Sequence, residues 1–164
     1  MSTPEDRLAE LGLVLPAPLQ LPPGVTLPFP WVRIVGIRAV ISGHGPTNAD
    51  GSLAQPLGKV GREVSEEQAY VAARLAGMAI LGSLKRELGS LSRIACWTRV
   101  FGMVNSAPGF TRQPAASMGS QTSSSACSAK SMGLTHVARS GLQSCPSASP
   151  SRSKARSNYS PGDA

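Results

Sequence analysis

Hydrophobic positions recur at helical spacing over residues 65–88, where apolar side chains follow one another at steps of three and four residues. Ser65 and Gln68 have the spacing of a capping box, which marks the start of a helix. Gly89 follows the last apolar position and can close the final turn. The pattern predicts one long helix over 65–88 with an apolar face for the core.

The N-terminal part of the chain alternates between helix, arm and strand patterns. Residues 4–14 (PEDRLAELGLV) predict a short amphipathic helix. Residues 15–30 hold so many prolines that neither a regular helix nor a central strand is possible, so we expect an extended arm on the surface. Residues 31–35 and 38–42 are rich in β-branched side chains and predict two short strands joined by a turn at Gly36.

After the long helix, residues 91–104 (LSRIACWTRVFGMV) predict a strand. Its two faces are both largely apolar, so we expect a central strand covered on both sides, with Cys96 as a small core residue. The order arm, strand, strand, helix, strand predicts an α+β fold of two layers, a mixed sheet backed by helices. The order is incomplete, because one helix covers three strands poorly and a further strand and helix would be expected next.

Charge and composition divide the 164 residues into two unlike parts. Residues 1–115 carry 11 basic and 8 acidic side chains, a net charge of +3, and both tryptophans. Residues 116–164 carry 5 basic side chains, 1 acidic side chain and 15 serines, a net charge of +4. Such a composition cannot bury enough apolar surface to offset the entropy of ordering the chain. We therefore expect one domain over 1–115 and a disordered basic tail over 116–164. The net charge of +7 does not indicate a single domain with one basic face.

The cysteines and the N-terminal residues indicate the cellular compartment in which the chain is expected. The cysteines are Cys96, Cys127 and Cys145, an odd number without CxxC spacing, so neither a disulfide framework nor a zinc site is expected. The acidic N-terminus lacks the basic start and apolar core of a secretory signal. No stretch of about 18 apolar residues predicts a membrane span. We expect a cytoplasmic protein without a metal site and without a membrane partner.

In four segments, at 40–46, 58–61, 72–75 and 99–110, the chain resembles the Rid family, the YjgF-like proteins also called endoribonuclease L-PSP or chorismate-mutase-like proteins. Residues 40–46 (VISGHGP) resemble the family's strand end, and residues 58–61 (GKVG) and the AARL of the long helix match in order. Residues 99–110 (RVFGMVNSAPGF) resemble its strand that runs into V-N. The resemblance covers about 1–115 and implies a chorismate-mutase-like α+β sandwich whose C-terminal strands and helix are missing from this chain.

The resemblance also implies a function and a site. Many members are cofactor-free homotrimers that hydrolyse enamines or 2-imino acids to 2-keto acids and ammonia. Ser42, Gly43 and Asn105 match positions that bind substrate in the family. The family's arginine, which would clamp a substrate carboxylate with two hydrogen bonds, and its late glutamate have no counterpart in this reading frame. The catalytic residues therefore stay unassigned, and we expect a poor trimer with little turnover.

The C-terminal third can be interpreted through the genetic code. Offset by one base, the codons from Ser117 onward can encode N-G-F-S-D-L-L, then A-R-S-A-V-G-V-A-E-L-P, then P-V-E-I-E-G-E-V-E-L. These are the missing family elements in order. We interpret this as a one-base frameshift, or a sequencing error, near 114–117. The triplet A-R-S at 138–140 is then a coincidence, and the arginine's role is not assigned to Arg139.

Alternatives remain open at each candidate residue. His44 is either a catalytic base or, more often for such positions, a structural histidine. Asn105 orients substrate or caps a turn. Ser42 lacks the sequence of a nucleophile elbow, so lining a pocket is the better interpretation. For the whole chain, the alternative to an impaired deaminase is a non-enzymatic truncated protein. RNA binding or cleavage is a weaker alternative, because a solvated tail explains the SPSRSKARS run equally well.

Overall fold

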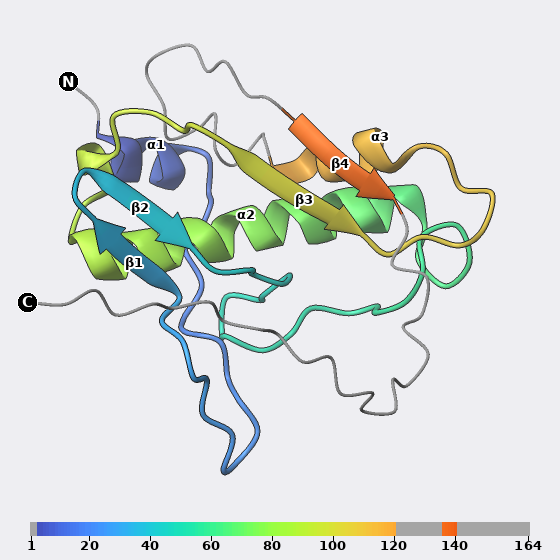
Figure 1. Cartoon of the computed structure of the whole chain (residues 1–164), viewed down its shortest axis with the longest axis horizontal. Coiled ribbons are helices and arrows are strands. Elements are labelled where there is room, and N and C mark those ends of the chain that lie inside the picture. The colour runs from blue at the N-terminus through green and yellow to red at the C-terminus, as the bar shows by residue number, and fades with distance from the viewer. Residues whose placement is uncertain (1–2, 121–135, 141–164) are drawn as a thin grey trace, which may run out of the picture.

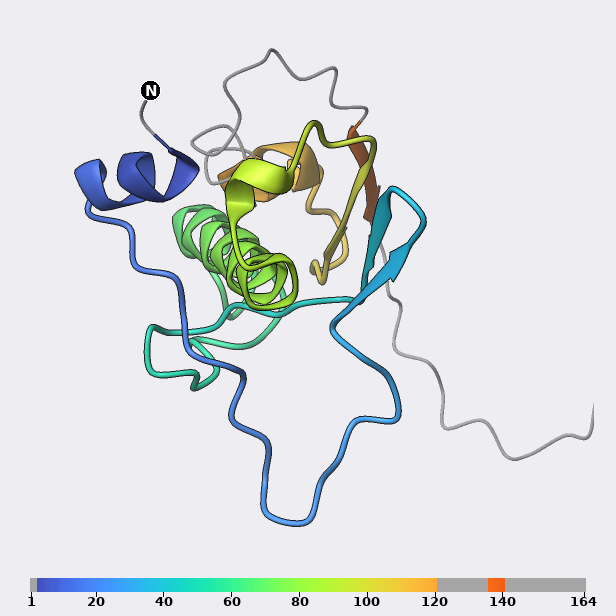
Figure 2. The same cartoon turned by 90° about the vertical axis from the view of Figure 1, so that its left-hand side faces the viewer.

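The computed structural model describes residues 3–120 and 136–140. Helix α2 (Glu66–Leu88) runs through the middle of the molecule, and the strands lie along one side of it (Figure 1). Viewed along α2, the strands form one layer, and helix α1 lies on the other side of α2 (Figure 2). The chain therefore has the α+β architecture of helices backing strands that the sequence predicts.

Helix α2 begins where the sequence predicts, because its first turn is capped from both directions. The Ser65 hydroxyl accepts a hydrogen bond from the Gln68 N–H at 3.2 Å. The Gln68 side chain in turn accepts the Ser65 N–H at 2.8 Å. The helix ends at Gly89, whose φ of 81° is unfavourable for other residues and whose N–H reaches the Lys85 carbonyl. The prediction of the long helix is confirmed.

Helix α1 (Pro4–Glu10) is shorter than the predicted span of 4–14. Thr3 caps its start, and Gly12 turns the chain out of the helix with a φ of 64°. The Leu13 N–H donates to the Leu8 carbonyl at 2.8 Å, which satisfies a carbonyl of the last turn. The glycine that the sequence places inside the span is thus the helix terminator.

Strands β1 (Val32–Val35) and β2 (Arg38–Ile41) form an antiparallel hairpin, as predicted. Val32 pairs with Ile41, and both contribute to the core beneath the hairpin. After the hairpin the chain leaves the sheet as an irregular loop that leads to α2. The arm at 15–30 has no helix or strand, in line with its prolines, and its outer bend projects from the body in Figure 2.

The predicted strand over 91–104 is only partly present. A short 3-10 helix, η1 (Leu91–Arg93), and an irregular segment precede strand β3 (Val100–Val104). The expectation that both faces of the strand are covered is wrong, because Phe101 is 47% exposed and Met103 is 64% exposed. The alternate residues Val100, Gly102 and Val104 are half-buried, so only one face of the strand is covered. Apolar side chains on both faces of a segment thus do not by themselves make a central strand.

The expected boundary at residue 115 is crossed by a helix. Helix α3 covers Gln113–Ser117, and Ala116 within it is 1% exposed. Strand β4 (His136–Ser140) pairs in parallel with β3, although the sequence shows no strand pattern there. The prediction of no strand in the tail is therefore wrong for these five residues. The rest of the expected tail, 121–135 and 141–164, lies outside the described residues.

Two groups of buried side chains hold the layers together. The leucine cluster lies around the C-terminal half of α2 and consists of Leu8, Val32, Met78, Leu81, Leu84 and Leu91. The valine–alanine cluster lies around its N-terminal half and consists of Val60, Val64, Ala69 and Ala116. Cys96 belongs to neither cluster and is exposed, so its prediction as a core residue is wrong. Its segment is irregular and outside the sheet.

Within the described part of the chain, none of the helices combines the length and the apolar character that a bilayer crossing requires.

Candidate functional site

The end of strand β2 presents the two candidate residues that follow each other in the chain, Ser42 and Gly43. The Ser42 N–H donates to the Trp31 carbonyl at 3.0 Å, which extends the hairpin by one pair. Its hydroxyl donates to the Pro30 carbonyl at 2.8 Å. Gly43 is exposed, with no atom within 4 Å of the position a side chain would take. The strand end is thus fixed at Ser42 and open to solvent at Gly43.

His44 turns back from this strand end toward α2. Its Nδ1 lies 2.7 Å from the Ser42 carbonyl, which can only accept, so Nδ1 carries the proton. In the neutral ring Nε2 is then an acceptor, and it lies 2.8 Å from the Ser83 hydroxyl. The Trp31 ring covers the imidazole at a centroid distance of 4.8 Å. His44 therefore ties the strand end to the middle of the molecule.

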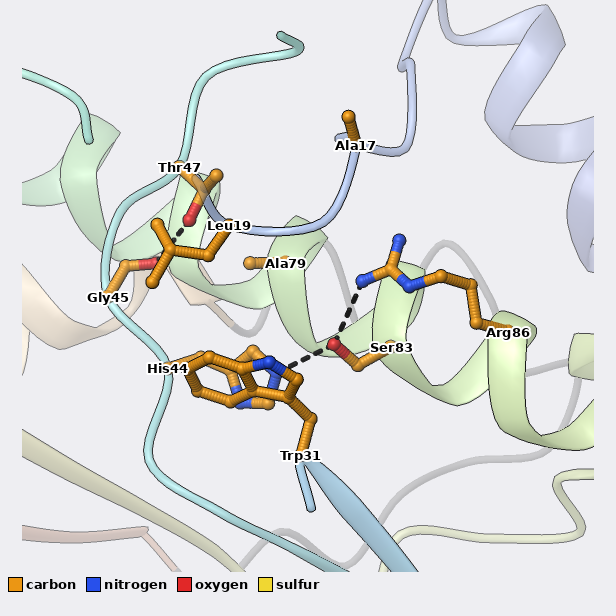
Figure 3. Close-up of a pocket in the computed structure, with 9 residues that line it drawn as sticks. All are labelled: Ala17, Leu19, Trp31, His44, Gly45, Thr47, Ala79, Ser83 and Arg86. Atoms are coloured by element: carbon orange, nitrogen blue, oxygen red, sulfur yellow. Dashed lines mark hydrogen bonds between the residues drawn. The ribbon is translucent and has the colours of Figure 1, made fainter. Parts of the chain in front are cut away.

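The Ser83 hydroxyl, which meets His44, also accepts a hydrogen bond from Arg86. Arg86 donates through Nη2 to Ser83 Oγ at 3.1 Å and through Nη1 to the Pro16 carbonyl at 3.0 Å. Ser83 and Arg86 lie one turn apart on α2, so both side chains point to the same side of the helix. Figure 3 shows His44 and Arg86 meeting at Ser83 from opposite sides. The arm, the strand end and the helix are joined at one hydroxyl group.

The electrostatics of this network favour neutral histidine. Burial lowers the pKa of His44, the hydrogen bond to the Ser42 carbonyl acts in the opposite direction, and the charge of Arg86 lowers it further. Burial also lowers the pKa of Arg86, which nevertheless stays charged because a guanidinium loses its proton only at strongly alkaline pH. At neutral pH the network thus holds one positive charge and a neutral histidine whose Nε2 accepts the hydrogen bond of the Ser83 hydroxyl.

Asn105 lies at a different place in the fold. Its side-chain Nδ2 donates to the Gly58 carbonyl at 3.3 Å, and its backbone carbonyl accepts the Val60 N–H at 2.9 Å. These bonds attach the loop before α2 to the end of β3. Asn105 shares no hydrogen-bond partner with Ser42, and its contacts are those of a turn-capping residue, the alternative to a role in substrate orientation.

Ser83 and Arg86 are the residues of this network that the sequence pattern did not single out. Arg86 fits equally well as a cation in the last turn of a helix, and Ser83 interrupts an apolar stripe that is otherwise strongly helical. The available signal was the pair Gly82–Ser83, two small residues at a position where larger side chains would fill the core. Gly82 lets the arm approach, since a side chain there would lie 3.3 Å from the Pro16 carbonyl.

A metal site finds no support in the described residues, because no three His, Cys, Asp or Glu side chains among them are close enough to share an ion. The network contains hydrogen-bond donors, the positive charge of Arg86 and the titratable ring of His44. These groups can bind a negatively charged or polar group, and a proton can move between Ser83 and His44.

Comparison with known proteins finds similarity among solved structures. No family model matches the chain, and no curated protein matches it. A candidate endoribonuclease from Shewanella oneidensis MR-1 is 29% identical with a TM-score of 0.71, covering 83% of this chain and 86% of that one. Protein Atu1372 of unknown function from Agrobacterium tumefaciens is also 29% identical, with a TM-score of 0.70, and the match covers 86% of this chain and 85% of that one.

These likenesses extend over most of both chains and agree with the motifs of the first 115 residues. The endoribonuclease description is one of the labels of the family to which the segments at 40–46, 58–61 and 99–110 are similar. The α+β arrangement of hairpin, long helix and V-N strand is the one that this resemblance implies. The chain therefore has a fold like that of the Rid and YjgF-like proteins.

Proposed function

We propose that this chain carries the substrate-binding part of a Rid-type imine or enamine deaminase and that its turnover is strongly reduced. In the reaction water adds to the imine carbon of a 2-imino acid, the C=N bond is replaced by C=O, and the nitrogen leaves as ammonia. No oxidant or cofactor is required for this hydrolysis. The observation that carries the proposal is the strand end at Ser42–Gly43, fixed by hydrogen bonds on a Rid-like fold.

The strand end supports binding of a small polar substrate. Because the Ser42 hydroxyl is committed to the Pro30 carbonyl, its oxygen lone pairs are oriented and can accept a hydrogen bond from a ligand. The missing side chain at Gly43 leaves room for a ligand beside the backbone. His44 holds the intervening carbonyl through Nδ1 and thereby limits the motion of both residues.

Reduced turnover follows from the C-terminal third. Water activation and clamping of the substrate carboxylate depend in the family on an arginine and a glutamate that this reading frame lacks. Removing one transition-state charge stabiliser costs about 100- to 1000-fold in turnover in other enzymes. Arg139 lies on β4, opposite Met103 of β3 in register. This placement makes Arg139 worth testing, although its neighbours differ from the family motif.

The test compares this chain with one in which a single base restores the offset frame near codon 115. A coupled assay follows ammonia release from a 2-imino acid generated in solution. We expect the restored chain to release ammonia at least about 100-fold faster and to form a trimer. Full turnover by the present chain, or an inactive restored chain that folds, would overturn the proposal. Arg139→Lys in the present chain tests whether Arg139 replaces the arginine of the family. If this single change removes the residual turnover of the present chain, Arg139 has that role.

Endoribonuclease activity is the second candidate, because the similar Shewanella protein carries that description and this chain has a net charge of +7. Cleavage of a labelled single-stranded RNA by the purified chain, lost in Ser42→Ala, would favour this candidate over deamination. Binding without cleavage, falling steeply with salt, would instead indicate a purely electrostatic contact with phosphates.

A further inference from the structure

A small pocket lies where the arm, the start of β1 and the long helix meet (Figure 3). His44, Gly45 and Thr47 border it from the loop after β2, and Ser83 and Arg86 border it from α2. Its remaining lining is Ala17, Leu19, Trp31 and Ala79. None of these nine residues is acidic. The pocket is thus bordered by a cation, a titratable ring and hydroxyl groups, without a carboxylate to balance them.

The Arg86 guanidinium has N–H groups that are not used in its hydrogen bonds to Pro16 and Ser83. Its guanidinium has five N–H groups, and the two bonds to Pro16 and Ser83 account for two of them. Arg86 takes part in neither the Arg62–Glu63 nor the Arg112–Glu66 ion pair of the described residues, and its guanidinium donates to a carbonyl and a hydroxyl, not to a carboxylate. The side chain keeps contact with solvent, so an ion can reach it from outside.

Ser83 and His44 can convert from a closed pair to two donors. With neutral His44, the Ser83 hydroxyl proton is used on Nε2 and its oxygen accepts from Arg86. When His44 takes up a proton, Nε2 becomes a donor and the Ser83 proton is free to point elsewhere. Nε2 then donates to the Ser83 oxygen, so the Ser83 hydroxyl and the unused N–H groups of Arg86 are the donors left for a ligand.

We propose that this pocket is a binding site for a monatomic monovalent anion, such as chloride, whose binding is coupled to protonation of His44. Size limits the ligand, because the pocket offers about 10 Å³, the space that one water molecule needs. A substrate-sized acid does not fit that space. The site therefore differs from the open strand end at Gly43 and does not depend on the proposed deaminase function.

Binding of an anion beside Arg86 and protonation of His44 should favour each other. Arg86 is the one charged group that faces His44 from the described elements packed around it. The arm contributes Ala17 and Leu19, the residue before β1 is Trp31, and α2 otherwise contributes Ala79 and Ser83. An anion beside Arg86 offsets its charge and makes protonation of His44 easier. By linkage, protonation of His44 tightens anion binding by the same factor. Anion affinity therefore rises as the pH falls.

The test measures thermal unfolding of the full chain in sodium chloride and sodium gluconate at equal ionic strength. Gluconate is too large for the pocket and controls for screening. At about pH 5.5 we expect about 100 mM chloride to raise the Tm by about 3 °C over gluconate, and at about pH 8 by less than about 1 °C. Equal Tm values in the two salts at both pH values would overturn the proposal.

Variants and a direct probe locate the effect. Arg86→Gln and His44→Gln should remove the difference between chloride and gluconate, and Arg86→Lys should keep part of it. Arg93→Gln is the matched control, since exposed Arg93 also donates to a backbone carbonyl near the end of the same helix. If a variant fails to fold, the chloride-35 resonance decides the question: the unmodified chain should broaden it at about pH 5.5 and much less at about pH 8. A chloride line that the protein leaves unchanged would reject the site, as would a full effect in Arg86→Gln.

Discussion

The two halves of α2 bury different kinds of side chain. Around the C-terminal half, Leu81 is 0% exposed and Leu84 is 2% exposed, and they pack with residues from α1, β1 and η1. Around the N-terminal half, the buried partners are smaller, chiefly Val60, Val64 and Ala116. One helix therefore joins a core of large aliphatic side chains to a core of small ones.

The two clusters come from different parts of the sequence and should contribute differently to the stability of the fold. The leucine cluster draws on segments that all precede residue 95, within the part of the chain that resembles the Rid family. The valine–alanine cluster includes Ala116, which lies where the resemblance stops. Buried area sets the hydrophobic contribution, so the leucine cluster should dominate the stability of this chain. The His44 network lies at the leucine end, and Asn105 lies at the other end.

The largest expected effect comes from Leu81→Ala. Removing a fully buried leucine side chain should lower the free energy of unfolding by about 3 kcal/mol, through lost transfer energy and a residual cavity. Val64→Ala at the other end should cost about 1.5 kcal/mol, at about 0.8 kcal/mol for each buried carbon removed. Urea unfolding measured by circular dichroism checks both values. Equal costs for the two variants would contradict the comparison.

A smaller effect is expected from Glu5→Ala, which tests how α1 is attached to the leucine end. One Glu5 carboxylate oxygen accepts the Leu91 N–H at 2.8 Å and the Ser90 hydroxyl at 3.2 Å. Its loss leaves the first turn of η1 without this cap and should cost about 1 to 2 kcal/mol. Glu10→Ala, an exposed change on the same helix, should cost less than about 0.5 kcal/mol. Unfolding curves of both variants that coincide would show that the cap contributes nothing.

Ser65→Ala tests the other end of α2 and should cost about 1 kcal/mol, because the Gln68 N–H loses its capping partner. Ser65→Asp should recover most of that loss, since a carboxylate at the same position also accepts the bond and favours the positive helix end. Urea midpoints of the three proteins give the ranking. A Ser65→Asp protein as unstable as Ser65→Ala would exclude capping as the cause.

The smallest expected effect is a pH dependence from His44. Its folded pKa is lowered by burial, so the unfolded chain binds the proton more readily than the folded chain. Stability from neutral His44 is present above the unfolded value of about 6.5 and is lost as the pH falls through the lower folded value. Unfolding in gluconate between about pH 8 and about pH 5 should show this loss, and His44→Gln should lack it. A loss of the same size in His44→Gln would assign it to other groups.

Local features of the chain were predictable because their causes lie within a few residues. The capping box at Ser65, the terminator Gly89 and the β-branched hairpin appear in the structure where the sequence places them. The prolines of 15–30 exclude regular structure whatever the surroundings. The same local reasoning fails at 91–104, where apolar side chains predict a covered strand and the chain instead exposes Phe101 and Met103.

The sequence by itself therefore determined the long helix, the hairpin, the extended arm and the resemblance of the first 115 residues to the Rid family. Tertiary structure decided that Ser83 and Arg86, about 40 positions after His44 in the chain, complete its hydrogen bonds. It also decided that the Pro16 carbonyl meets Arg86 and that Asn105 binds the Gly58 carbonyl instead of approaching Ser42. The reason is physical: periodicity and capping depend on near neighbours, whereas these pairings depend on how the arm and loops cross the helix.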